Sequence, residues 1–143
     1  LAEYTPQSPS LVLSLHACDT ATDMALGLGI RSSAAAIACV PCCHKELLAS
    51  YKAPGVDAFT RHGILRARLC DVLTDGLRVL KLESLGYETG VVEFVSPVDT
   101  PKNLLITARR VASENPRARK EYEDMCRRMG VYPAIERYSM CLE

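Results

Sequence analysis

The stretch Leu11-Val12-Leu13-Ser14-Leu15, followed directly by His16-Ala17-Cys18-Asp19, decides the fold class of this 143-residue chain. Its first five residues are almost all apolar and show no polar alternation, which is typical of a strand buried on both faces in a parallel sheet. The small and polar residues that follow end the strand, and Asp19 or Thr20 is placed to cap a helix. The stretch therefore predicts a buried strand that leads into a helix.

A second unit of the same kind follows. Residues 34–40 form the next apolar run and end at Pro41-Cys42-Cys43-His44, after which residues 44–50 favour a helical turn. Residues 64–85 carry apolar side chains at helical spacing and predict a long amphipathic helix. A solvated helix face is the usual meaning of charges that fall off such a stripe, which here are Arg61, Arg66, Arg68, Asp71, Asp75, Arg78 and Lys81.

Two further apolar and β-branched runs, residues 87–95 and 104–111, predict an antiparallel strand pair. A charged helix then begins at Asn115-Pro116 and ends before Gly130. This order of elements predicts an α/β fold in which helices pack on a mainly parallel sheet. Ligands of such sheets bind at the carboxyl ends of the strands, which is where both Cys- and His-containing motifs lie.

Composition narrows the class of protein further. Hydrophobic residues make up 48% and charged residues 24%, which argues against global disorder and fibrous structure. The 17 basic and 17 acidic side chains give no net charge, so bulk charge does not bind nucleic acid, although a local basic face still could. Seven cysteines, an odd number with two adjacent, do not suit a disulfide framework and indicate a reducing, cytoplasmic setting. No secretory signal or membrane-spanning pattern occurs, and we expect no membrane partner.

The first strand-end motif has two interpretations. The ordinary one is a strand-to-helix turn with Asp19 as the helix cap. The functional one uses backbone N–H groups to receive an acceptor and the Asp19 carboxylate to bind an amine or a hydroxyl.

The second motif offers thiols. Cys42 or Cys43 could act as a nucleophile with help from His44, but adjacent side chains do not generally face each other, and buried packing is the alternative. A metal could instead be held by a convergent set from both motifs, consisting of Cys39, Cys42, Cys43, His44, His16 and Cys18. Because Cys39-x-x-Cys42 lacks a second matching pair, we expect no metal.

Two other regions could meet a partner. Lys102 lies in a connection of turn-forming residues, beside Asn103, and could contact an anion. Basic residues could contact RNA, although a solvated face is the usual reading and a 6% aromatic content gives no stacking platform. These residues are Arg61, His62, Arg66, Arg68, Arg109, Arg110, Arg117, Arg119, Lys120, Arg127 and Arg128.

Three motifs in order resemble class I S-adenosylmethionine-dependent methyltransferases. They are the stretch from Leu15 to Asp23, then Pro41-Cys42-Cys43-His44, then Thr100-Pro101-Lys102-Asn103. The resemblance is to a methyltransferase-like group with an HACG or HACD strand end and a CC motif, once labelled rRNA adenine dimethylase-like, and it covers about residues 10–111. It implies a Rossmann-like sheet of order 3-2-1-4-5-7-6 with the last strand antiparallel. Leu11–Leu15 would be strand 4, residues 34–40 strand 5, and the hairpin strands 6 and 7.

The resemblance also implies site residues. His16, Ala17 and Cys18 would contact the cofactor, S-adenosylmethionine. Pro41, Cys42 and Cys43, with Lys102 and Asn103, would lie near the methyl acceptor. His16, Asp19 and His44 would be catalytic, with Asp19 orienting the acceptor and a histidine accepting a proton.

The chain departs from the family pattern in one large respect. It lacks the glycine-rich loop and the ribose-binding acidic residue, since Gly27-Leu28-Gly29 lies within a predicted helix. We therefore expect the C-terminal portion of a longer methyltransferase, an expectation that the initial Leu also favours. Residues 1–9 would be an extended lead-in, 10–112 a partial methyltransferase domain and 113–143 a helical extension. Such a chain should not bind S-adenosylmethionine tightly by itself and should be inactive alone.

Without the preceding strands, Leu11–Leu15 would be an exposed apolar edge. We expect self-association through this strand, or its coverage by residues 1–9. The acceptor, whether RNA, protein or small molecule, is not specified by the sequence. The alternative function is a non-catalytic RNA- or protein-binding or assembly module.

Overall fold

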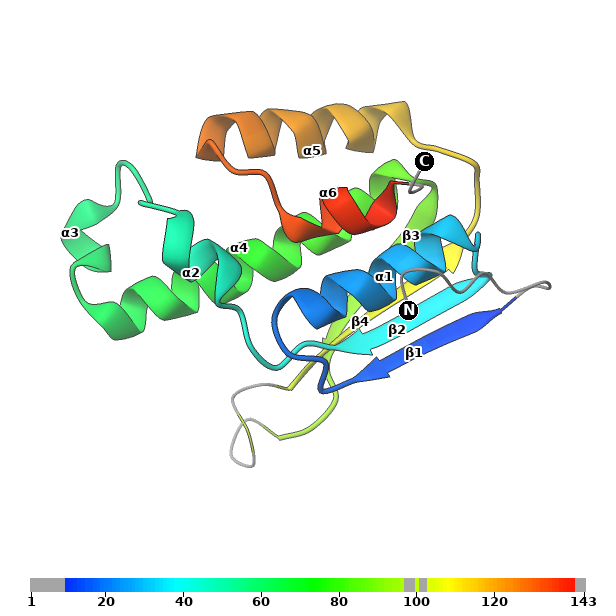
Figure 1. The fold of residues 1–143 in the computed structure, drawn as a ribbon, viewed down its shortest axis with the longest axis horizontal. Helices are drawn as coiled ribbons and strands as arrows, with labels where there is room; N and C mark the ends of the chain where they lie inside the picture. Colours follow the sequence, from blue (N-terminus) through cyan, green and yellow to red (C-terminus); the bar gives the residue numbers. More distant parts are fainter. Residues whose placement is uncertain (1–9, 97–99, 101–102, 141–143) are drawn as a thin grey trace.

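The structure, a computed structural model, describes residues 10–96, 100 and 103–140. Four strands and six helices occur in these residues (Figure 1). In chain order they are β1 (Leu11–Leu15), α1 (Thr20–Arg31), β2 (Ala36–Val40), α2 (Glu46–Ser50), α3 (Asp57–Thr60), α4 (Gly63–Ser84), β3 (Tyr87–Glu93), β4 (Leu104–Arg110), α5 (Pro116–Met129) and α6 (Ala134–Ser139). None of the helices among the described residues has the length and apolar character needed to cross a membrane.

The four strands form one sheet in the order β1-β2-β4-β3. β1 and β2 run parallel, with Leu11 opposite Ala36, and β4 runs antiparallel to both of its neighbours. The parallel pair and the β3–β4 hairpin confirm the strand directions predicted from the apolar runs. This mixed α/β arrangement is compatible with a Rossmann-like fold.

The helices pack on one face of the sheet. The alternate strand residues Ile37, Cys39 and Ile106 are buried there together with side chains from three helices, namely Leu26 of α1, Leu82 of α4 and Ile135 of α6. α5 lies further out and packs on α4 through a second apolar cluster around Tyr122 and Leu77 (Figure 1). Of the two C-terminal helices, α6 therefore shares the core of the sheet, and α5 belongs to the second cluster.

Glycine permits one of these close helix contacts. A Cβ atom on Gly27 would lie 2.2 Å from the backbone oxygen of Tyr138, which is closer than any real contact. The same oxygen accepts a hydrogen bond from the Arg31 guanidinium, so α6 is fixed against α1. Glycine at position 27 therefore allows α6 to pack closely against α1.

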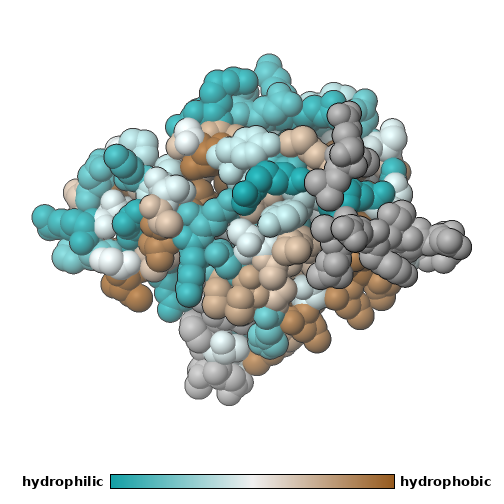
Figure 2. Space-filling view, in the orientation of Figure 1, coloured by the Kyte–Doolittle hydropathy of each residue, from teal (hydrophilic) through white to brown (hydrophobic). Residues whose placement is uncertain are grey.

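No helix among the described residues packs on the opposite face of the sheet, and residues 1–9, which were expected to cover β1 if it does not self-associate, lie outside the described residues. Leu11, Leu13 and Leu15 are 60%, 65% and 71% exposed. β1 is the edge strand, and its apolar side chains form part of the hydrophobic surface at the lower right of Figure 2. Across this face runs a shallow depression of about 480 Å³, bordered by residues such as Ala36, Ala38 and Thr107. Among the described residues, no segment pairs with the outer side of β1.

Candidate site at the carboxyl ends of β1 and β2

The loops that follow β1 and β2 lie side by side because the two strands are parallel. The backbone N–H of His16 donates to the Val40 oxygen at 3.2 Å, and that of Asp19 donates to the Cys43 oxygen at 3.1 Å. The two motifs therefore form one surface, although Cys18 and Cys42, for example, are 24 residues apart in the sequence. Their predicted meeting at one sheet edge is confirmed.

The first loop has an unusual backbone. His16 and Asp19 have φ angles of 56° and 53°, in the left-handed region that residues other than glycine rarely adopt. Such conformations cost about 1–3 kcal/mol each and persist where the surroundings hold them. Here the inter-loop hydrogen bonds hold them, and His16 and Cys18 remain exposed.

Asp19 has a structural task in this arrangement. Its Oδ1 accepts hydrogen bonds from the backbone N–H groups of Lys45, at 2.8 Å, and Glu46, at 3.1 Å. It therefore caps the start of α2, although the sequence pattern pointed to a cap on α1. At α1 the structure shows no side-chain cap from Asp19. The Asp19 carboxylate thus ties the two loops together.

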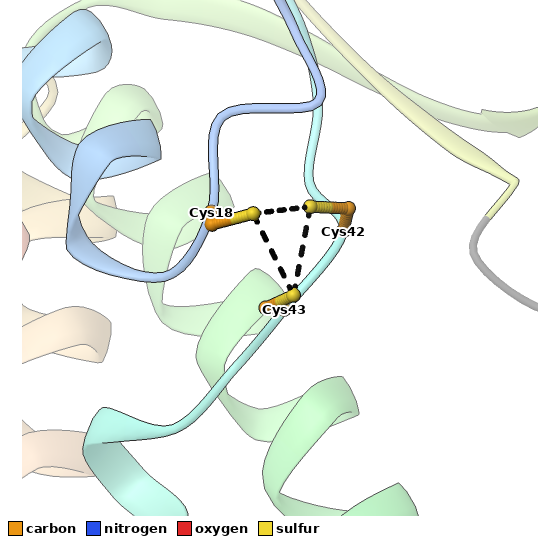
Figure 3. A group of neighbouring side chains, drawn as sticks. All are labelled: Cys18, Cys42 and Cys43. Atoms are coloured by element: carbon orange, nitrogen blue, oxygen red, sulfur yellow. Dashed lines mark hydrogen bonds between the residues drawn. The ribbon is translucent and has the colours of Figure 1, made fainter.

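Three thiols converge at the surface of the paired loops (Figure 3). The Sγ of Cys18 lies 3.1 Å from that of Cys42 and 3.7 Å from that of Cys43, and the latter two are 3.6 Å apart. Hydrogen bonds from the thiols of Cys42 and Cys43 lower the pKa of Cys18. The hydrogen bond with Cys18 raises the pKa of Cys42 to about 12. Within the group, the pKa of Cys18 is therefore lowered and that of Cys42 is raised by their mutual contact.

Cys39 does not join this group. It is buried on the helix-covered face of the sheet, and burial raises its pKa to about 12. The packing role predicted for a cysteine within a strand run applies to Cys39. It does not apply to Cys18, which is exposed, or to Cys42 and Cys43, which are half-buried.

A buried ionic network lies beneath the loops. The Arg78 guanidinium, 1% exposed, donates through Nε and Nη2 to both carboxylate oxygens of Asp23, at 2.9 and 2.7 Å. Its Nη1 donates to Asp75 at 3.0 Å, and its Nη2 also reaches the Asp19 backbone oxygen at 3.0 Å. Burial lowers the pKa of Arg78, but hydrogen bonds and charge from Asp23 and Asp75 outweigh it and raise the pKa overall. Arg78 thereby links α4, α1 and the first loop.

His44 belongs to the same network. Its Nε2 lies 2.9 Å from Asp75 Oδ1, and its Nδ1 lies 3.1 Å from Asp71 Oδ1. The histidine is buried, and both ring nitrogens face carboxylates of α4. This geometry anchors the second loop on α4 and turns the ring away from the three thiols. The family resemblance implies a catalytic role for His44, and the sequence offered the neighbouring cysteines as partners; the structure pairs its ring with Asp71 and Asp75.

A small cavity of about 130 Å³ adjoins His44. Its lining residues include Pro41, Arg68, Val72 and Leu104. Pockets for whole cofactors or drug-sized ligands typically enclose roughly 300–1,000 Å³, so this cavity suits only a small group of atoms. Pro41 lies at the end of β2 and borders this cavity.

One of the remaining predicted residues, Asn103, directly precedes Leu104, which lines the cavity beside His44 at the same edge of the sheet. Lys102 falls outside the described residues. Asn103 is buried, donates through Nδ2 to the Val95 oxygen at 2.8 Å, and accepts from the Phe94 N–H at 3.1 Å. Asn103 therefore closes the hairpin, as a turn-forming residue does.

The basic residues of α5 are largely paired with acids near them. Arg117 contacts Glu121 at 3.0 Å, Arg119 contacts Glu114 at 2.7 Å, and Arg127 contacts Asp124 at 2.7 Å. Such exposed pairs match the reading of a solvated helix face.

Sequence reasoning missed the ionic network. The expected solvated face of residues 64–85 is wrong for Asp75 and Arg78, which are buried. Their spacing carried a signal, because Asp71, Asp75 and Arg78 fall at positions i, i+4 and i+7 of one helical face. A row of charged side chains on one helical face can be buried where an oppositely charged side chain from another element pairs with it, as Asp23 does with Arg78.

Comparison with known proteins gives one match. A family model described as a methyltransferase domain matches residues 2–50, which include β1, α1, β2 and both strand-end motifs. No curated protein and no solved structure matches the chain. Over these residues the chain is similar to a methyltransferase domain.

Proposed function

We propose that this chain is the C-terminal part of an S-adenosylmethionine-dependent methyltransferase, with β1, β2, β4 and β3 as strands 4, 5, 7 and 6 of the parent sheet. The observation that carries the proposal is the match to a methyltransferase domain over residues 2–50, the segment that holds both strand-end loops. The sheet order, with β4 reversed, is the order expected for that half of the fold. The exposed edge of β1 is where strand 1 of the parent sheet would pair.

The residues present fit one wall of a cofactor site. His16, Ala17 and Cys18 end β1 at the edge where ligands of such sheets bind. The cavity of about 130 Å³ beside the second loop is too small for the whole cofactor. When bound, S-adenosylmethionine supplies an electrophilic methyl group on its sulfonium. We propose that the chain alone is inactive, because the glycine-rich loop and ribose-binding acid of the family are not in it.

Catalysis in the parent enzyme would rest mainly on positioning the acceptor. His16 is exposed at the end of β1 and is our candidate for accepting a proton from the acceptor. Asp19 and His44 act as positioning residues, since their polar atoms hold the two loops in place. Cys42 and Cys43 remain at the acceptor side of the same edge.

We propose a protein or RNA acceptor, and a cytoplasmic location in keeping with the free cysteines among the described residues. A non-catalytic RNA-binding module is the alternative. The ion pairs along α5 leave it less unpaired positive charge than the sequence pattern implied. A salt-sensitive shift of RNA by this chain alone would favour that module.

The exposed apolar side chains of β1 support a second part of the proposal. The isolated chain should self-associate through β1, because Leu11, Leu13 and Leu15 are exposed on an unpaired edge strand. Leu13→Glu should reduce the sedimenting mass at a given concentration, while Val72→Glu, an exposed apolar site on α4, should leave it unchanged. A monomeric wild-type chain at high concentration would contradict self-association.

Calorimetry tests the methyltransferase proposal. We expect the whole encoded protein to bind S-adenosylmethionine, and the 143-residue chain not to bind it tightly. Ala17→Asp should weaken binding to the whole protein, whereas Ala58→Asp, an exposed site in α3, should not. Micromolar binding to the 143-residue chain would overturn the claim that it is incomplete. Absence of binding to the whole protein would overturn the claim of a methyltransferase.

A further inference from the structure

The three thiols of Cys18, Cys42 and Cys43 form a group to which the proposed methyl transfer assigns no chemical step, although their loops border its proposed site. They are drawn from two loops and point toward one another (Figure 3). Their sulfur atoms lie 3.1, 3.6 and 3.7 Å apart, beyond the S–S bond of about 2.05 Å. The group is at the surface, unlike Cys39 and Cys70, which are packed in the two cores.

We propose that Cys18, Cys42 and Cys43 bind one Zn²⁺ ion as thiolates. Two thiolates on a tetrahedral zinc, each about 2.3 Å from the metal, lie about 3.8 Å apart. The separations of 3.6 and 3.7 Å match this value, and only the Cys18–Cys42 separation of 3.1 Å must widen. An all-sulfur set selects a soft ion and excludes Mg²⁺ and Ca²⁺, which require oxygen ligands.

The protein holds the ligand loops before any ion arrives. The Asp19 N–H donates to the Cys43 oxygen, and the Asp19 carboxylate accepts from Lys45 and Glu46. Arg78 in turn donates to the Asp19 backbone oxygen. Outer contacts of this kind orient ligands and raise metal affinity.

The incomplete Cys39-x-x-Cys42 spacing led us to expect no metal. Three members of the convergent set, Cys18, Cys42 and Cys43, come together in the structure, and Cys39 does not join them. Within the described part of the chain, no fourth His, Cys, Asp or Glu atom joins the three sulfurs, and the His44 ring is engaged by Asp71 and Asp75. Three protein ligands with one position left for water or an anionic donor are typical of reactive zinc sites.

Zinc binding is a ligand exchange that releases protons. Each thiol that becomes a ligand releases its proton to solvent, and the ion exchanges bound water for sulfur. No redox step is involved, so the proposal requires reduced cysteines and Zn²⁺ alone.

Cobalt and zinc titrations of the reduced, untagged chain test the site. We expect Co²⁺ to give an intense sulfur-to-metal charge-transfer band and the visible bands of a tetrahedral ion, both removed by one equivalent of Zn²⁺. Zn²⁺ should bind with a stoichiometry of one in competition with a chromophoric chelator. Cys18→Ser, Cys42→Ser and Cys43→Ser should each weaken binding by more than the roughly 100-fold loss known for outer contacts.

Cys126→Ser is the matched control, because Cys126 is half-buried on α5 and lies outside the group. It should bind Zn²⁺ as the wild type does, and circular dichroism should show every variant folded. Absence of the charge-transfer band, or equal binding by a folded variant that lacks all three thiols, would overturn the proposal. So would a Cys18–Cys42 disulfide that persists under reductant and blocks the metal. Neither readout depends on S-adenosylmethionine, so this proposal can fail independently of the methyltransferase proposal.

Discussion

The exposed thiol group and the buried ionic network lie at the same edge of the sheet, but the thiols belong to the two loops, whereas the network is made by side chains of α1 and α4. Arg78, Asp23 and Asp75 are buried and satisfy one another's charges. Cys18 is exposed and Cys42 and Cys43 are half-buried; their thiols contact one another, and that of Cys18 also contacts the His16 backbone oxygen. The network holds the loops in place, and the loops carry the thiols at the surface.

This difference separates two kinds of importance. A change in the network should lower the free energy of unfolding substantially, because it leaves a charge without a partner in the interior. A change in the thiol group should leave the fold intact and alter only what the surface binds. The following predictions test that division, beginning with the largest effect.

Arg78→Met should lower the free energy of unfolding by about 3–5 kcal/mol, because Asp23 and Asp75 would remain buried without their cation. Urea denaturation measures the loss. Arg117→Met provides the control, since its pair with Glu121 is exposed and worth about 0.3–0.5 kcal/mol. If both substitutions cost the same, the network does not have the role assigned to it.

Zinc should stabilise the reduced chain. At a free concentration about 100 times Kd, it should raise the free energy of unfolding by about 2.7 kcal/mol, and a chelator should reverse this. The measurement is thermal or urea unfolding with and without Zn²⁺. A variant with serine at positions 18, 42 and 43 should show no such gain, and an equal gain would place the ion elsewhere.

Asp19→Ala should cost about 1 kcal/mol, through loss of the cap on α2, and should reduce zinc affinity by about 10–100-fold. Asp19→Asn should restore most of both, because Asn also caps and tolerates a positive φ. Ser33→Ala controls for the backbone, since Ser33 has a φ of 52° outside the site. Failure of Asp19→Asn to restore zinc affinity would argue against a positioning role for Asp19.

Cys18→Ser without metal should change the free energy of unfolding by no more than about 0.5 kcal/mol, as expected for an exposed site. Cys39→Ser should cost more, about 1–3 kcal/mol, because it buries a hydroxyl within the core. Equilibrium unfolding under reductant compares the two. A large loss for Cys18→Ser would show that the thiol group supports the fold.

Apolar runs and turn residues were sufficient to predict most of the elements. The predicted helix over residues 64–85 is α4, Gly63–Ser84, and the predicted strand over 34–40 is β2, which begins later, at Ala36. The short α3 had no counterpart, because its four residues carry no periodic signal. Local sequence also located both strand ends, since parallel strands bring their carboxyl ends to one edge.

Contacts between distant residues were harder to predict. Nothing near Asp23 in the sequence predicts its pairing with Arg78, 55 residues later: the sequence places Asp23 in the first strand-end motif and predicts a solvated face for Arg78. A convergent set that includes Cys18, Cys42 and Cys43 was among the predicted possibilities, whereas the cap that Asp19 provides to α2 was not. These choices depend on how the two loops pack, which local patterns do not encode.

The central claim is that the two loops form one wall of the cofactor site. Hydrogen exchange of the whole encoded protein, with and without S-adenosylhomocysteine, tests this claim. We predict slower exchange in peptides covering residues 15–19 and 41–46 when the ligand is present, and no change in α5. Protection of other regions with these loops unaffected, or no protection at all, would contradict the account.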